Sequence, residues 1–284
     1  MAVFTGYNFY IMKNFSLIVV GILFIYCVSS CRKQVDKGFE MTVDLSISNP
    51  YLPMSVLVDT IESVRLQLPS PYFWGMVDNV ISKDSCYYIS DRKQEMAFRF
   101  SKNGTFLNAI GQRGEGPGEY REMDSFFVGK DCVYVCDMGK RTIYSYSFDG
   151  KFLHSLSFPY SLVFNDVVEL PDGRFLCHRP SQSENCKGLW ILDQKGRRVK
   201  NLLEYEKGTP CKNSYWNTLC AQEDGTIKIY NPVDGSYYQY DAVNDTVVRT
   251  MRQKSNLPML ADFHCSDREL YETKEECTYS LFTV

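Results

Sequence analysis

The sequence lacks most patterns that mark catalytic, metal-binding or nucleic-acid-binding proteins. None of its three histidines lies in an H-x-x-x-H or H-E-x-x-H arrangement, which excludes the helical zinc motif of metalloproteases. It has no C-x-x-C zinc spacing and no G-x-S-x-G nucleophile motif. A net charge of −3 without long runs of like charge gives no basic face for nucleic acid. We therefore predict no catalytic residue, metal ligand, cofactor or nucleic-acid partner.

Helical periodicity is also missing, because no segment longer than a turn or two repeats every 3.6 residues. Aromatic residues make up 14% of the chain, and flat rings suit the half-buried surface of a strand. From Thr60 onward, short strand-like segments alternate with turns rich in Gly, Asp and Asn. The sequence therefore predicts an all-β fold.

A repeat of about 46 residues organises these strands. Gly104, Gly150 and Gly196 are each 46 residues from the last, and Asn-Gly or Asp-Gly supplies the positive φ of a tight hairpin. Asn244-Asp245 takes the turn in a weaker fourth copy. The three clear hairpins span residues 97–107, 143–153 and 189–199.

A second recurring piece precedes each hairpin, as in Ser82-Lys-Asp-Ser-Cys86 and Gly129-Lys-Asp-Cys132. Each unit therefore holds about four strands, which is the content of a propeller blade. A β-sandwich explains the pattern less well, because sandwiches do not repeat at a fixed four-strand period. The fold class predicted is a β-propeller of four-stranded blades over residues 58–284.

The N-terminus has the features of a secretory signal over residues 1–30. Lys13 is the only charge there, and an apolar run of 13 residues from Phe15 precedes the small residues Ser29 and Ser30. The run is shorter than the roughly 20 residues that span a bilayer. Met12, directly before Lys13, is a candidate for the true start of the protein.

Val28-Ser-Ser-Cys31 resembles a bacterial lipobox, although the family prefers Leu at the place of Val28 and Gly or Ala at the place of Ser30. The resemblance implies that Cys31 is lipidated and that residues 31–57 form a tether. Two alternatives stay open: an ordinary signal peptide, and an uncleaved anchor helix over residues 14–31.

Nine cysteines follow Cys31. An odd number in a large domain does not indicate a disulfide framework. Cys132 and Cys136 bracket a predicted strand and lie on one face about 13 Å apart, too far for a bond. We expect most of these cysteines to be small buried hydrophobic residues.

The segment Gly114-Glu-Gly-Pro-Gly-Glu-Tyr120 follows Ile110-Gly111 and resembles the linker of six-bladed β-propeller lipoproteins of gut Gram-negative bacteria, relatives of NHL-repeat propellers. The resemblance covers roughly residues 50–260. It implies that this segment connects two blades, rather than cradling phosphate, and that residues 58–66 form a lead-in strand. Glu119 and Tyr120 are the only candidates for binding residues, facing the central channel or a partner.

The length of the chain limits the number of blades. Six blades of this length need about 276 residues, whereas 225 remain from Thr60 to Val284. Residues 262–284 do not resemble a closing blade. We expect a propeller truncated at its C-terminus, with closure by five blades as the alternative.

Several residues have both a functional and a structural interpretation. Asp91 and Asp137 end equivalent strands, where acids commonly cap turns; a ring of such acids would instead hold Ca²⁺. His154, His178 and His264 are interpreted as ordinary strand or loop residues. The clusters Tyr72-Phe73-Trp74 and Tyr237-Tyr238 are expected to fill space between blades rather than stack on sugars.

These observations favour an envelope-anchored lipoprotein with a non-enzymatic binding or scaffold propeller. Its expected partners are the membrane, through the lipid on Cys31, and an envelope protein or a glycan. Because Arg32-Lys33-Gln34 rather than an acidic stretch follows Cys31, we expect the periplasmic face rather than the cell surface. The alternative is a metal-dependent propeller hydrolase or lactonase.

Overall fold

The computed structural model describes residues 39–43, 53, 55, 58–180, 188–204, 218–222, 224–232 and 234–255. The chain divides into two compact units, Met1–Asp36 and Lys37–Val284, and every described residue belongs to the second. The predicted signal peptide, Cys31, the start at Met12 and the segment 262–284 therefore lie outside the described residues. Within the described part, no helix has the length and apolar character needed to cross a bilayer.

Four sheets, each of four consecutive antiparallel strands, make up this unit, and a further strand joins the fourth sheet. Blade 1 contains β2 (Val77–Lys83), β3 (Cys86–Asp91), β4 (Met96–Ser101) and β5 (Phe106–Ile110). Blade 2 contains β6 (Ser125–Val128), β7 (Val133–Asp137), β8 (Thr142–Tyr146) and β9 (Phe152–Ser157). Blade 3 contains β10 (Asp166–Glu169), β11 (Phe175–Arg179), β12 (Gly188–Leu192) and β13 (Arg198–Leu203). Blade 4 contains β14 (Leu219–Ala221), β15 (Ile227–Asn231), β16 (Ser236–Asp241) and β17 (Thr246–Ser255).

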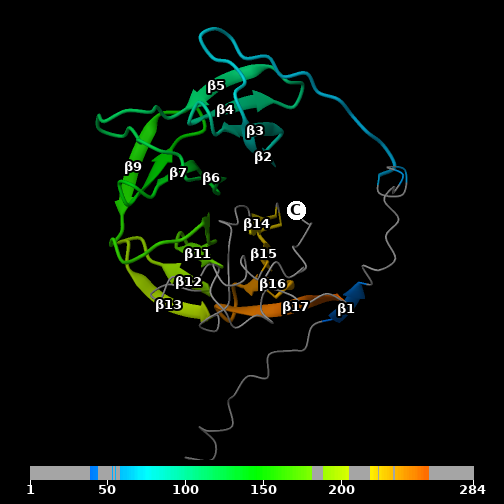
Figure 1. Cartoon of the computed structure of the whole chain (residues 1–284). Helices are drawn as coiled ribbons and strands as arrows, with labels where there is room; N and C mark the ends of the chain where they lie inside the picture. The colour runs from blue at the N-terminus through cyan, green and yellow to red at the C-terminus, as the bar shows by residue number, and fades with distance from the viewer. Residues whose placement is uncertain are drawn as a thin grey trace, which may run out of the picture. The chain divides into compact units, whose positions relative to one another are not determined.

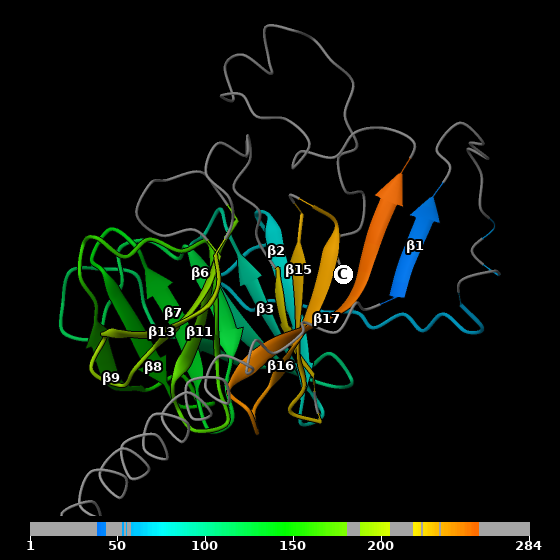
Figure 2. The same cartoon turned by 90° about the horizontal axis from the view of Figure 1, so that it is seen from below.

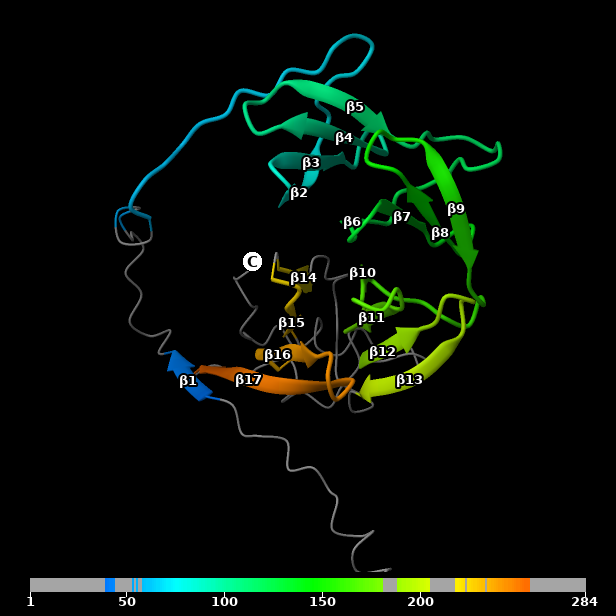
Figure 3. The same ribbon diagram turned by 180° about the vertical axis from the view of Figure 1, so that it is seen from behind.

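The blades are arranged around a common axis as in a β-propeller, which confirms the predicted fold class (Figure 1). The first strand of each blade lies nearest the axis and the fourth lies at the periphery, as the view from behind also shows (Figure 3). Along the axis, β2 contacts β6, β6 contacts β10, and β10 contacts β14. The described part of the chain contains no α-helix.

The repeated hairpin glycines explain how one blade fits against the segment before it. Gly104, Gly150 and Gly196 have φ values of +87°, +86° and +74°, a region that side chains disfavour. A Cβ at Gly150 would lie 2.2 Å from the carbonyl oxygen of Ala109 in the outer strand of blade 1. Gly196 approaches the carbonyl of Ser157 in blade 2 in the same way. The glycines therefore serve both the turn and the contact between blades.

Hydrophobic cores lie between successive blades, and a further core packs blade 1 against the segment before it. Tyr88 and Ala97 of blade 1 share a buried cluster with Val133 and Tyr146 of blade 2. A second cluster joins blades 2 and 3, and a third joins blades 3 and 4. Each blade thus buries one sheet face against the next, as layered β-structure requires.

The predicted lead-in strand over residues 58–66 is wrong, because this segment forms no strand. Most of its side chains are exposed, and no described strand pairs with it. The chain instead attaches to the outer face of blade 1 further on, where Tyr72 and Trp74 pack on Phe98 with ring centroids 5.2 and 5.9 Å apart.

The N-terminal strand of this unit is β1 (Phe39–Val43), which lies within the residues expected to form the tether. It pairs in parallel with the end of β17, from Met251 to Ser255 (Figure 2). β16 pairs with β17 from Thr246 to Arg252, so the two pairings overlap at Met251 and Arg252. One long strand therefore connects blade 4 to a segment more than 200 residues earlier in the sequence.

Candidate functional site

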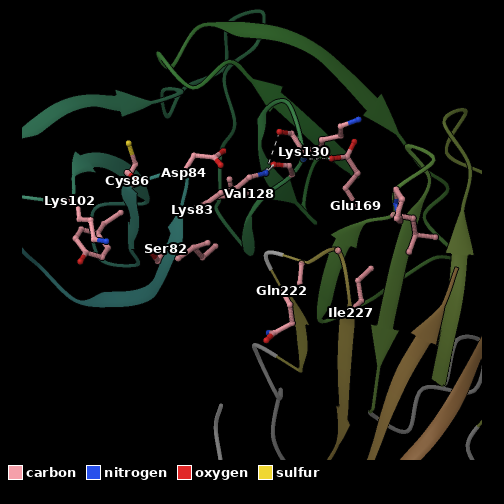
Figure 4. Close-up of a pocket in the computed structure, with 18 residues that line it drawn as sticks. Ser82, Lys83, Asp84, Cys86, Lys102, Val128, Lys130, Glu169, Gln222 and Ile227 are labelled. Atoms are coloured by element: carbon pink, nitrogen blue, oxygen red, sulfur yellow. Dashed lines mark hydrogen bonds between the residues drawn. The ribbon is translucent and has the colours of Figure 1, made fainter. Parts of the chain in front are cut away.

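A pocket of 690 Å³ lies at one end of the axis, among the turns that follow the inner strands (Figure 4). All four blades contribute to its lining: 81–87 and Lys102 from blade 1, 128–130 from blade 2, 169–171 from blade 3, and Ala221, Gln222, Gly225 and Ile227 from blade 4. A second cavity of 330 Å³ extends to Asp166 and shares five lining residues with it: Ile81, Ser82, Val128, Ala221 and Gln222. The pocket therefore exists only when the blades are assembled.

Lys83 connects blade 1 to blade 2 at the mouth of this pocket. It is the last residue of β2 and is half-buried. Its Nζ donates to the carbonyl oxygen of Gly129, and to that of Lys130 at 3.3 Å. Among the described residues it forms no ion pair. The ammonium is therefore fixed in position while its charge is not neutralised by a carboxylate.

Glu169 makes the corresponding connection between blades 3 and 2. Its Oε2 accepts a bond from the backbone N–H of Lys130 at 2.9 Å, and its Oε1 accepts one from the hydroxyl of Tyr134 at 2.8 Å. Burial raises the pKa of Tyr134, and its hydrogen bonds to Cys132 and Glu169 raise the pKa further. Both carboxylate oxygens of Glu169 therefore accept hydrogen bonds from the pocket wall.

Gly129 provides the space for this contact. A Cβ there would lie 2.2 Å from Oε2 of Glu169 and 2.5 Å from the ring of Tyr134. The repeated Lys-Asp turns were visible in the sequence, but only the structure shows that Lys83, Gly129 and Glu169 meet across three blades. No acidic residue stands at the equivalent place in the other blades, so the repeat did not indicate a role for Glu169.

Three further charges border the pocket without such contacts. Lys102, Lys130 and Asp84 are exposed, and within the described part their side chains make no hydrogen bond or ion pair. They lie in turns at the opening (Figure 4).

A buried polar cluster lies between blades 3 and 4, beyond the smaller cavity. Asp166 Oδ2 accepts bonds from the Leu219 N–H at 2.8 Å and the Thr218 hydroxyl at 3.4 Å. Nδ1 of His178 lies 2.6 Å from Oγ1 of Thr218. Burial raises the pKa of Asp166 to about 6 and lowers the pKa of His178 to about 3. Because these side chains are buried, the cluster joins the two blades rather than facing solvent.

The family of the chain follows from its match to a family model. The model described as "Domain of unknown function (DUF4934)" matches residues 40–279. The chain belongs to the DUF4934 family. The match covers all four blades and all of β1 except Phe39. Curated proteins give no match.

Solved structures similar to this DUF4934 chain come from several Bacteroides species. A "Putative exported protein" from Bacteroides fragilis NCTC 9343 is 22% identical, with a TM-score of 0.56, over 68% of this chain and 55% of that chain. A protein of unknown function from Bacteroides caccae is 14% identical, with a TM-score of 0.38, over 67% and 64%. The chain thus spans less than two thirds of the length of either protein. The first likeness supports the propeller fold.

The structure shows Asp91 and Asp137 of the DUF4934 fold as turn caps, as predicted. Oδ2 of Asp137 accepts bonds from the N–H groups of Arg121 and Glu122, and its Oδ1 accepts one from Lys140 at 2.7 Å. Asp91 accepts equivalent bonds in blade 1. Among the residues that the structure describes, no group of three His, Cys, Asp or Glu side chains is placed to hold a metal ion.

Glu119 and Tyr120 lie in the linker between blades 1 and 2, away from the pocket lining. Glu119 Oε2 accepts a bond from the Gly116 N–H at 2.8 Å, and the buried Tyr120 donates its hydroxyl hydrogen to the carbonyl of Glu95 at 3.0 Å. Lys140 Nζ donates to the carbonyls of Gly114 and Glu119, both at 3.0 Å. These contacts order the linker, and a binding role for the pair stays a prediction.

The remaining candidates have structural positions. His154 is exposed on β9, and Tyr238 lies in the core between blades 3 and 4. Five described cysteines are free thiols, four of them buried as predicted: Cys86, Cys132, Cys136 and Cys177, with Cys220 half-buried. His264 and the four other cysteines after Cys31 lie outside the described residues.

Proposed function

We propose that this DUF4934 protein is a lipoprotein of the cell envelope whose propeller binds a ligand without catalysing a reaction. The axis pocket carries the proposal, because it collects residues from all four blades into one concavity of 690 Å³. That volume lies within the roughly 300–1,000 Å³ of ordinary ligand sites. The wall consists of short hairpins fixed to one another through Lys83 and Glu169, and such a rigid frame suits recognition.

The localisation that we propose rests on the N-terminal sequence. Cys31 follows an apolar segment and small residues, as in a lipobox, and acyl chains on it would anchor the protein at about 0.8 kcal/mol per buried methylene. A structural neighbour is described as a putative exported protein, which is consistent with this localisation. We place the propeller on the periplasmic face, with an envelope protein or a glycan as partner. We also relate it to the six-bladed, NHL-like propellers.

The binding role is tested by filling the pocket. Ser82 lines it and is exposed, so S82W should occupy the opening with little effect on the cores. The matched control is S155W, on the exposed outer strand β9. We expect cross-linking in intact cells to enrich a partner or glycan with wild type and S155W, but not with S82W. Equal capture by S82W, or no enrichment with any form, contradicts the proposal.

The anchor is tested separately with C31S. Wild type should incorporate labelled palmitate and sediment with membranes, whereas C31S should do neither, because the serine cannot form the thioether. An unlabelled wild-type protein would remove the lipoprotein part of the proposal and leave the binding role intact.

A further inference from the structure

We propose that the axis pocket recognises a carboxylate group on a ligand that also has an uncharged body, a proposal that rests on the pocket being the binding site. The shared chemistry has two possible sources: an acidic sugar of one or two rings, or the C-terminal end of a peptide.

The acids and lysines of the lining are engaged differently. Glu169 gives both oxygens to the wall, one to the Lys130 N–H and one to Tyr134. The Lys83 ammonium donates to two carbonyl oxygens and lies 5.9 Å from the ring centroid of Phe148, so its partners are uncharged. A carboxylate bound by two donors is poorly available to a ligand, whereas an ammonium held by neutral acceptors keeps its full charge.

Lys102 and Lys130 add two ammonium groups from turns of different blades. Neither side chain forms an ion pair within the described part, whereas some exposed cations elsewhere do, as in Arg92–Asp78 at 2.8 Å and Lys151–Asp149 at 2.8 Å. Among the described lining acids, Asp84 is the one whose carboxylate is not bonded. The lining therefore has an excess of positive charge, which a bound anion would neutralise.

Part of the wall between these charges is apolar. Ile81 and Val128, both half-buried, line the pocket between the lysine-bearing turns. A bare inorganic anion would leave this surface wet, whereas a carboxylate attached to an uncharged body covers it. The lysines of the lining therefore favour a carboxylate, and its apolar residues favour an uncharged body attached to that carboxylate.

The test is calorimetric titration of the full chain in detergent micelles with two acid–neutral pairs of probes. Digalacturonate is compared with its methyl ester, and the peptide Ala-Val-Ala-Leu with its C-terminal amide. We expect one acid to bind and its neutral partner to bind about tenfold more weakly. K102M and K130M should each weaken the acid about fivefold. The control K195M, in the corresponding hairpin turn of blade 3, should bind as wild type.

The two acids distinguish the sources, and the one that binds identifies which is used. Equal binding of acid and neutral forms, or wild-type affinity in both K102M and K130M, overturns the carboxylate inference. If S82W still abolishes that binding, the pocket remains the ligand site and only the ligand class is wrong. Failure of both acids also overturns the inference, and the cross-linking comparison of S82W with S155W then decides the proposed function by itself.

Discussion

Backbone N–H groups, rather than cations, hold the buried carboxylates of this protein. Burial alone would raise the pKa of Asp91, but N–H groups of Gln94, Gly75 and Met76 outweigh it and lower that pKa. Asp166 also accepts backbone bonds, yet burial dominates there and raises its pKa to about 6. Repeat-equivalent acids at strand ends were recognisable from sequence as caps. The depth of Asp166 depends on the docking of blade 4, which the sequence does not reveal.

Asp166 and His178 give opposite pH dependences to stability. The pKa of Asp166 is raised from 3.8 to about 6 on folding, so its contribution is present at low pH and is lost as pH rises through 6. The pKa of His178 falls from 6.5 to about 3, so its contribution is present above pH 6.5 and is lost as pH falls toward 3. In wild type the two effects offset each other between these limits.

Single substitutions should therefore separate them in urea unfolding at pH 4, 5.5 and 7. Relative to wild type, D166N should gain stability as pH rises from 4 to 7, by on the order of 3 kcal/mol. H178Q should gain a similar amount as pH falls over the same range. Difference curves that are flat for both variants would show that the cluster is not buried as described.

At the scale of elements, the hairpins were predictable because their determinants are local. The turn glycines and their spacing of 46 residues are readable in the sequence, and the structure places each in a left-handed turn. Strand β1 was not predictable, because its partner in β17 is distant in the sequence. Residues 58–66 failed as a strand for the same reason: a strand needs a partner edge, and none was available to infer.

The hairpin glycines allow the energetic cost of backbone strain to be measured separately from the cost of a close contact between blades. Gly150 and Gly225 have similar φ values of +86° and +82°, but a Cβ meets the Ala109 carbonyl at 2.2 Å in the first case and nothing within 4 Å in the second. We expect G225A to lose about 1 kcal/mol, from backbone strain alone. G150A should lose about 3 kcal/mol, because the neighbouring strand must also move. Equal losses in urea unfolding would mean that the contact between blades contributes nothing.

At the scale of the molecule, function and stability have the same origin in contacts between blades. The pocket draws on turns from four blades, and three cores are each shared by two successive blades. The sequence revealed the repeat, the fold and the turns that border the pocket. It did not reveal which turn residues meet, because Lys83, Gly129 and Glu169 come together only through the placement of whole blades.

Shared cores also predict that distant blades unfold together. Trp190 is fully buried in the core between blades 2 and 3, so W190A should cost about 3–5 kcal/mol. In the W190A/W216F protein Trp74 is the one remaining tryptophan, so its fluorescence reports blade 1, where this ring packs on Phe100, and far-ultraviolet circular dichroism reports all blades; W190F/W216F is the matched reference, and V243A is made in it. Both signals should shift together to lower urea, while V243A, at a 94% exposed site, should shift neither. Two separated transitions in W190A would mean that blade 1 is held by its own contacts, and that the pocket can lose one wall while the rest of the propeller stays folded.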